Sequence, residues 1–125
     1  MEDKENVKTF MDLNVWKEGH ELVMRGYVIT KNFPKEEMYG LSSQLRRALI
    51  SITSNIAEGF GRPSYKEKLR FYYISKGSLL ETQNQLIVAK DLNYLSKEDF
   101  DKINNKLIIV HKMLNAFITK TKTFI

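Results

Sequence analysis

The sequence predicts an all-α fold, an antiparallel up-down four-helix bundle. Apolar residues recur at steps of three and four over four long segments, which is the periodicity of helices with one buried face. The chain has two prolines, Pro34 and Pro63, and both fall where this periodicity breaks, so they separate helices and do not kink one. No segment alternates apolar and polar residues in steps of two between turn residues. We therefore predict no strand.

The first helix should run from about Asn14 to Lys31, and its apolar face includes Gly19 and Gly26. A glycine inside a helix costs about 1 kcal/mol relative to alanine. Its presence on a buried face is typical of close approach by a neighbouring helix, and we expect both glycines at such a contact.

The second helix should follow the turn at 33–34 and end at 59–61 (GFG), where a glycine in the left-handed conformation would cap it. Beside its apolar stripe lies a polar stripe of Arg47, Ser51, Asn55 and Glu58, with Ser54 among them. This stripe is either a solvated face or a hydrogen-bonded structural network between helices or subunits.

A serine followed three residues later by an acid predicts the start of both remaining helices, Ser64 with Glu67 and Ser96 with Asp99. The third helix should reach about Leu92 and carries apolar residues on two sides. One side comprises Leu69, Tyr72, Tyr73, Leu79, Leu80, Leu86 and Ile87, and the other Phe71, Ile74, Ser78, Ala89 and Leu92. The domain's own core covers one side, and in so short a chain the second cover is most simply another subunit.

The length of 125 residues predicts one domain, 1–125, with a short flexible N-terminus of about ten residues. The first residues are polar and acidic, unlike a secretory signal, and no apolar run approaches the ~20 residues of a membrane span. We therefore expect a cytoplasmic protein.

No residue pattern indicates catalysis or a metal site. The chain has no cysteine, and neither His20 nor His111 has a glutamate three residues before it, the spacing of di-iron bundles. We expect His20 to be exposed and His111 to be a hydrogen-bonded structural residue. No serine, histidine and acid form a nucleophilic signature. The expectation is a protein with no enzymatic activity, no cofactor and no metal.

The charge balance of 20 basic against 15 acidic residues, with a pI near 9.4, favours a polyanionic partner such as RNA or DNA. Bases interleaved with aromatic residues over 62–73 can meet phosphates and stack on unpaired nucleotides, although aromatics at helical spacing are more often core. The stretch from Lys106 onward adds four lysines and no acid. The candidate nucleic-acid-binding residues are Arg62, Lys66, Lys68 and Arg70, with Arg46 on the second helix.

Three segments carry a resemblance to a known family: 33–37 (FPKEE), 39–48 (YGLSSQLRRA) and 51–62 (SITSNIAEGFGR). Together with Arg70-Phe71, Gly77 to Leu79, Glu81, Gln85-Leu86 and 93–95 (NYL), they closely resemble the bacterial four-helix bundle proteins encoded in 23S rRNA intervening sequences. The resemblance covers the chain from about Phe10 to Lys120. Asn93 stands where the family usually has glycine, and asparagine can form the same left-handed cap.

The resemblance implies an up-down helical bundle that assembles into a ring-shaped homopentamer. Relatives include the accessory variability determinant of diversity-generating retroelements, a basic pentamer that works with a reverse transcriptase and nucleic acid. The family has no established catalytic activity, and the position of its genes inside rRNA suggests RNA binding. We therefore expect a basic, non-enzymatic oligomer that binds RNA or a ribonucleoprotein. The alternative is a protein-binding scaffold with no nucleic-acid contact.

Overall fold

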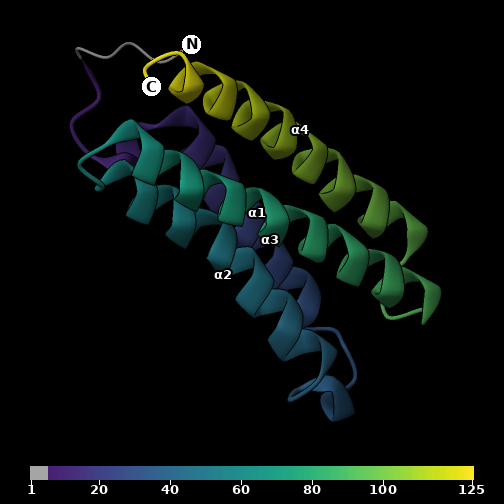
Figure 1. Ribbon diagram of the computed structural model, residues 1–125. Helices are drawn as coiled ribbons and strands as arrows, with labels where there is room; N and C mark the ends of the chain where they lie inside the picture. Colours follow the sequence, from purple (N-terminus) through teal and green to yellow (C-terminus); the bar gives the residue numbers. More distant parts are fainter. Residues whose placement is uncertain (1–5) are drawn as a thin grey trace.

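The computed structural model describes residues 6–125, which form four α-helices and no strand (Figure 1). This confirms the predicted all-helical class. The helices are α1 (Asn14–Thr30), α2 (Leu41–Phe60), α3 (Tyr65–Asp91) and α4 (Lys97–Lys122). Two short 3-10 turns, η2 (Phe10–Asp12) and η3 (Lys35–Glu37), precede α1 and α2.

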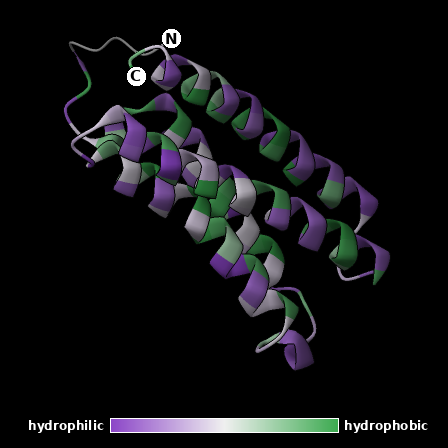
Figure 2. Ribbon diagram, viewed as in Figure 1, coloured by the Kyte–Doolittle hydropathy of each residue, from purple (hydrophilic) through white to green (hydrophobic). Residues whose placement is uncertain are grey.

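Each helix packs against two others around a common core. Both α1 and α3 contact α2 and α4. Each helix runs back along the one before it (Figure 1). Fully buried leucines and isoleucines from all four helices, such as Leu22, Leu49, Leu79 and Leu114, form one hydrophobic cluster. Hydrophilic and hydrophobic residues alternate along every helix, as expected for helices that bury one side (Figure 2).

The helix starts follow the predicted capping residues. Ser64 Oγ accepts a hydrogen bond from the Glu67 amide at 3.2 Å, and Ser96 Oγ accepts one from the Asp99 amide at 3.1 Å. Asn93 has a φ of 62° after α3, as its predicted left-handed cap requires. These three local predictions are confirmed.

The predicted left-handed glycine at the end of α2 is wrong. Gly61 has a φ of −79°, in the right-handed region. The chain continues in tight right-handed turns, in which the Gly61 amide donates to Ala57 O and the Arg62 amide to Gly59 O. Because these bonds satisfy the last carbonyls of α2, no left-handed residue is needed before Pro63.

The glycines of α1 lie at the contact with α2, as predicted. A Cβ added at Gly19 would meet Thr53 Cγ2 at 3.1 Å, and one added at Gly26 would collide with Leu49 Cδ1. Gly59 lies in the same way at the contact between α2 and α3, because a Cβ added there would lie 2.6 Å from Tyr72 Cε1. The two helix contacts therefore depend on residues without side chains.

The N-terminal residues predicted to be flexible, about 1–10, lie partly outside the described residues. Of those described, Val7 and Phe10 pack against the core, and Thr9 caps η2 through the Met11 amide. None of the described helices combines the length and the apolar character needed to cross a membrane.

Candidate nucleic-acid interface

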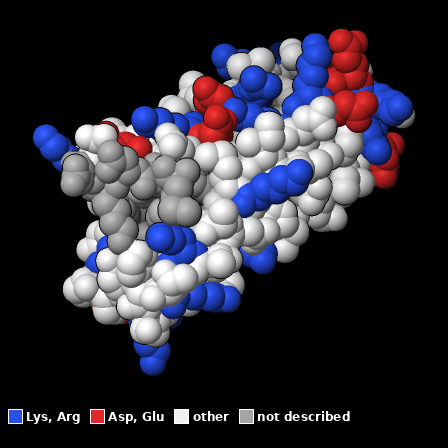
Figure 3. Space-filling view, turned by 90° about the horizontal axis from the view of Figure 1, so that it is seen from above, with Lys and Arg blue, Asp and Glu red and all other residues white. Residues whose placement is uncertain are grey.

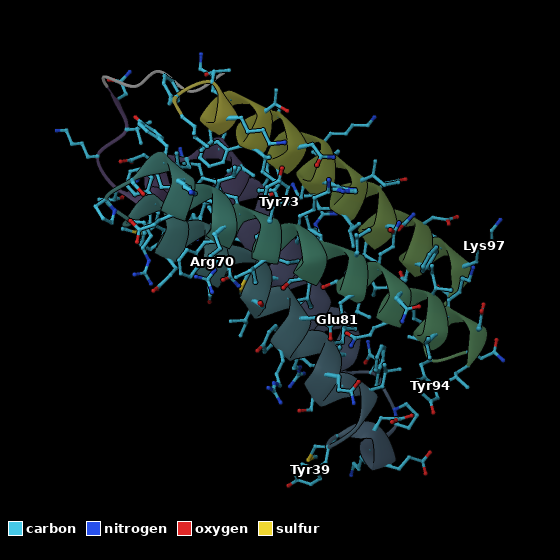
Figure 4. The ribbon with its side chains drawn as sticks, in the orientation of Figure 1. Tyr39, Arg70, Tyr73, Glu81, Tyr94 and Lys97 are labelled. Carbon is cyan, nitrogen blue, oxygen red and sulfur yellow. The ribbon has the colours of Figure 1, made fainter. Side chains whose placement is uncertain are left out.

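Lys66 and Arg70, two of the five predicted nucleic-acid-binding residues, lie one helical turn apart on α3. Both side chains are exposed, and neither forms an ion pair within residues 6–125. Arg70 projects from the flank of α3 nearer α2, and Tyr73 lies on the flank nearer α4 (Figure 4). Both cations are therefore available to an external anion.

Arg62 lies beside them at the end of α2. Its Nη2 is 2.7 Å from Glu58 Oε1, and its guanidinium carbon lies 4.5 Å from the centre of the Phe71 ring. The two side chains of the ion pair are 38% and 55% exposed. An exposed pair of this kind contributes at most about 0.5 kcal/mol, so an external phosphate can compete for Arg62.

The other two predicted residues are placed elsewhere. Lys68 Nζ donates a 2.5 Å hydrogen bond to Phe60 O, and burial lowers the pKa of this lysine. Arg46 is near the opposite end of α2, where its Nε donates to Thr30 Oγ1 at 2.8 Å. The structure thus brings together Arg62, Lys66 and Arg70. Lys68 lines a neighbouring hollow with Tyr65 and Lys120, and Arg46 lies apart from all of them.

The lysines that end α4 were not among the predicted nucleic-acid-binding residues. Lys122 Nζ lies 5.3 Å from the centre of the Tyr73 ring, and Lys120 Nζ lies 5.5 Å from that of Phe124. Phe124 also stacks on Tyr65 at 4.9 Å. The predicted up-down topology could have identified them, because it places the end of the fourth helix beside the start of the third.

These residues define one surface, which we call the basic end. It comprises Arg62, Lys66, Arg70, Lys120 and Lys122, with the half-exposed rings of Tyr65 and Tyr73. At the opposite end, beside the α3–α4 connection, exposed acids lie among exposed lysines (Figure 3): Asp91, Glu98, Asp99 and Asp101 with Lys97 and Lys102. The basic end has Glu58 and Glu67 beside its five cations, so cations are in excess there.

The polar stripe of α2 is divided between two environments. Asn55 Nδ2 donates to Ser51 O at 2.8 Å and to Ser51 Oγ at 3.0 Å, and Ser78 Oγ of α3 donates to Ser51 Oγ at 2.8 Å. Ser51 and Asn55 thus belong to a network between helices of one subunit. Arg47 and Glu58 lie outside it and are exposed.

The outward side of α3 carries exposed apolar residues together with polar ones. Ile74, Leu80, Ile87 and Val88 are 44%, 50%, 40% and 39% exposed, and Glu81 and Asn84 are exposed on the same helix. We call the four apolar residues the outer face of α3. At its centre, Gly77 has no atom within 4 Å of where its Cβ would be. Ser78 and Ala89, from one of the two predicted apolar sides, are instead buried inside the subunit.

The histidines show no arrangement for chemistry. His20 is exposed, as predicted, and stacks on Trp16 at 4.9 Å. The prediction of a hydrogen-bonded His111 is wrong, because its buried Nε2 has no partner among residues 6–125. Burial and the charge of Lys76 lower the pKa of His111. No three potential metal-binding side chains gather anywhere in the described part of the chain.

The comparisons with known proteins agree with this architecture. The chain is similar to a crystal structure from Bacteroides thetaiotaomicron, of a protein with unknown function from the S23 ribosomal protein family. The TM-score is 0.78 at 24% identity, over 84% of this chain and 95% of that one, a likeness that shows the fold alone. No curated protein matches the chain. The model of the 23S rRNA-intervening sequence protein family matches residues 11–116. Because this match spans most of the sequence, the chain belongs to the family of 23S rRNA-intervening sequence proteins.

Proposed function

We propose that this chain is a non-enzymatic, self-associating helical bundle that binds RNA through its basic end. The observation that supports RNA binding is the meeting of two distant basic segments, 62–70 and 120–122, around exposed tyrosine rings. Glu58, which is paired with Arg62, and Glu67 offset part of this charge, but the five cations of the basic end remain in excess.

The chemistry of the basic end fits single-stranded RNA. Lysine and arginine side chains neutralise phosphates without regard to sequence, and exposed rings such as Tyr65 and Tyr73 can stack on unpaired bases. Stacking and charge contacts of this type discriminate little between bases. We therefore expect binding with weak sequence preference.

Self-association is the second part of the proposal, and the outer face of α3 supports it. Exposed apolar side chains that gather on one side of a helix are typical of an interaction site. The outer face combines four large apolar side chains with the open position at Gly77, which would allow a partner helix to approach closely. The expected number of subunits, five, follows from the resemblance to ring-shaped pentamers. In this ring each antiparallel bundle presents one basic end.

A ring would strengthen the binding of one RNA strand. Each subunit alone offers few phosphate contacts, but repeated basic ends can engage the same strand at once. If two or three subunits each neutralise about two phosphates, the slope of log affinity against log salt should be about −3 to −4, from ~0.7 ions released per phosphate.

The test is a filter-binding titration of the chain with single-stranded and structured RNA at several salt concentrations. The proposal predicts that the logarithm of the affinity falls linearly with the logarithm of the salt concentration, with a slope of about −3 to −4. If no RNA binds even at low salt, RNA binding is refuted, and the outer face of α3 then favours the alternative, a scaffold that binds only protein.

A further inference from the structure

A hollow of about 820 Å³ lies far from the basic end, where α1 meets the start of α2. Its walls come from the end of α1, the α1–α2 connection and the first three turns of α2. This volume is in the range of sites that hold small ligands, roughly 300 to 1,000 Å³. Neither the family match nor the proposed RNA surface accounts for it.

Four cationic side chains line the hollow, and no carboxylate does. They are Lys31, Lys35, Arg46 and Arg47. Within residues 6–125, none of the four forms an ion pair. Glu37, the carboxylate of the adjoining turn, does not line the hollow, and it accepts hydrogen bonds from the Leu41 amide at 3.2 Å, at the first residue of α2, and from Tyr94 Oη at 2.8 Å. The hollow is therefore a site of positive potential.

Polar donors converge on the same place from the first turn of α2. Ser42 is only 7% exposed and lines the hollow, and its hydroxyl makes no hydrogen bond within the described residues. The amides of Ser42 and Ser43 are in the first turn, which has no intrahelical acceptors, and Glu37 caps the Leu41 amide of that turn. Because helical side chains lean toward the N-terminus, Arg46 and Arg47 lean back toward this turn.

Arg46 is already fixed in position. Its Nε donates to Thr30 Oγ1 at 2.8 Å, and its guanidinium carbon lies 4.7 Å from the centre of the Tyr27 ring. These contacts leave its terminal nitrogens for a ligand. A preoriented guanidinium beside helix N-terminal amides is a suitable receptor for a phosphate group.

The rim of the hollow suits a flat aromatic group. Tyr39 is 93% exposed and borders the site together with Met38 and Ile50, which are 55% and 44% exposed. A lone phosphate would use none of this apolar surface. We propose that the hollow binds a nucleotide, with its phosphate at the first turn of α2 between Arg46 and Arg47 and its base against Tyr39.

The nucleotide can be a free mononucleotide or the 5′-phosphorylated end of an RNA. Calorimetric titration of the full chain with AMP, adenosine and inorganic phosphate tests the shared chemistry. AMP should bind at least tenfold more tightly than either fragment. Trinucleotides with a 5′-phosphate or a 5′-hydroxyl separate the two sources. Tighter binding of the phosphorylated trinucleotide than of AMP assigns the RNA end, and the reverse order assigns the free nucleotide.

Variants separate the parts of the site. Arg47→Gln should weaken both AMP and phosphate about tenfold, whereas Tyr39→Ala should weaken AMP alone. Ser43→Asp should abolish both, while thermal stability is kept because an acid in the first turn favours the helix. Arg25→Gln, at an exposed arginine of α1 outside the hollow and the basic end, is the matched control and should change neither. The inference is refuted if the parent binds none of these probes, or if Arg47→Gln and Ser43→Asp bind AMP as the parent does.

Discussion

Replacing Leu80 and Ile87 together by glutamate should convert the proposed assembly into monomers. Both side chains are 40–50% exposed on the outer face of α3, so the isolated bundle can keep its fold with either residue charged. In a ring, the same positions would lie in an apolar contact between subunits. A charge buried there without a partner costs several kcal/mol, and symmetry repeats it at every interface. Sedimentation velocity at micromolar concentration measures the result.

The matched control is Val28→Glu on α1, whose side chain is 62% exposed and outside the outer face. It should leave the assembly unchanged. Circular dichroism should show the same helical content for the parent and both variants. Substitutions at Ser78 or Ala89 would not serve, because these residues are buried within the subunit and a charge there would unfold it. A monomeric parent, or a double variant that stays assembled, would contradict the proposed interface.

Gly59→Ala should lower the free energy of unfolding by about 1 to 2 kcal/mol. The new methyl group would meet the Tyr72 ring at 2.6 Å and Phe71 Cβ at 3.0 Å. Tyr72 is 2% exposed and packs on Phe117, so its ring has little room to retreat. Overpacking of this kind costs about 1 to 3 kcal/mol, of which the better helix propensity of alanine returns up to about 1 kcal/mol.

The control for this prediction lies two residues away. A Cβ added at exposed Gly61 would be 3.6 Å from its nearest atom, an ordinary contact, and its φ of −79° suits any residue. Gly61→Ala should therefore leave stability unchanged or raise it slightly. Chemical denaturation of both variants at one protein concentration gives the comparison. Equal stability of the two variants would show that the contact between α2 and α3 does not depend on Gly59.

The helices were predictable because their signals are local. The capping serines, the prolines and the three-and-four spacing each act within one or two turns, so the predicted first helix, 14–31, differs from α1 by one residue. The end of α2 was mispredicted because glycine permits a left-handed cap but does not require one. Likewise, the sequence places His111 beside the apolar stripe of its helix, and this position does not show whether a hydrogen-bond partner lies within reach.

The residues of the candidate site were predictable only where the geometry of a single helix decides which side chains lie on the same side. Lys66 and Arg70 are four residues apart and share a side, whereas Lys68 is two residues from each and must face another way. The meeting of Lys122 with Tyr73 depends on how α4 packs along α3. The hollow beside Arg46 depends on three segments at once, and no pattern within one helix indicates it.

The most direct test of the RNA-binding proposal is the charge reversal Lys66→Glu with Arg70→Glu. Its control, Lys97→Glu with Lys102→Glu, makes the same change of net charge near the start of α4, away from the basic end (Figure 4). Titration with single-stranded RNA at several salt concentrations should give a slope of about −3 to −4 for the parent and the control. The basic-end variant should bind all sequences far more weakly, with a flatter slope. Equal weakening of both variants, or RNA binding by the basic-end variant at the parent's affinity, would contradict RNA binding at this surface.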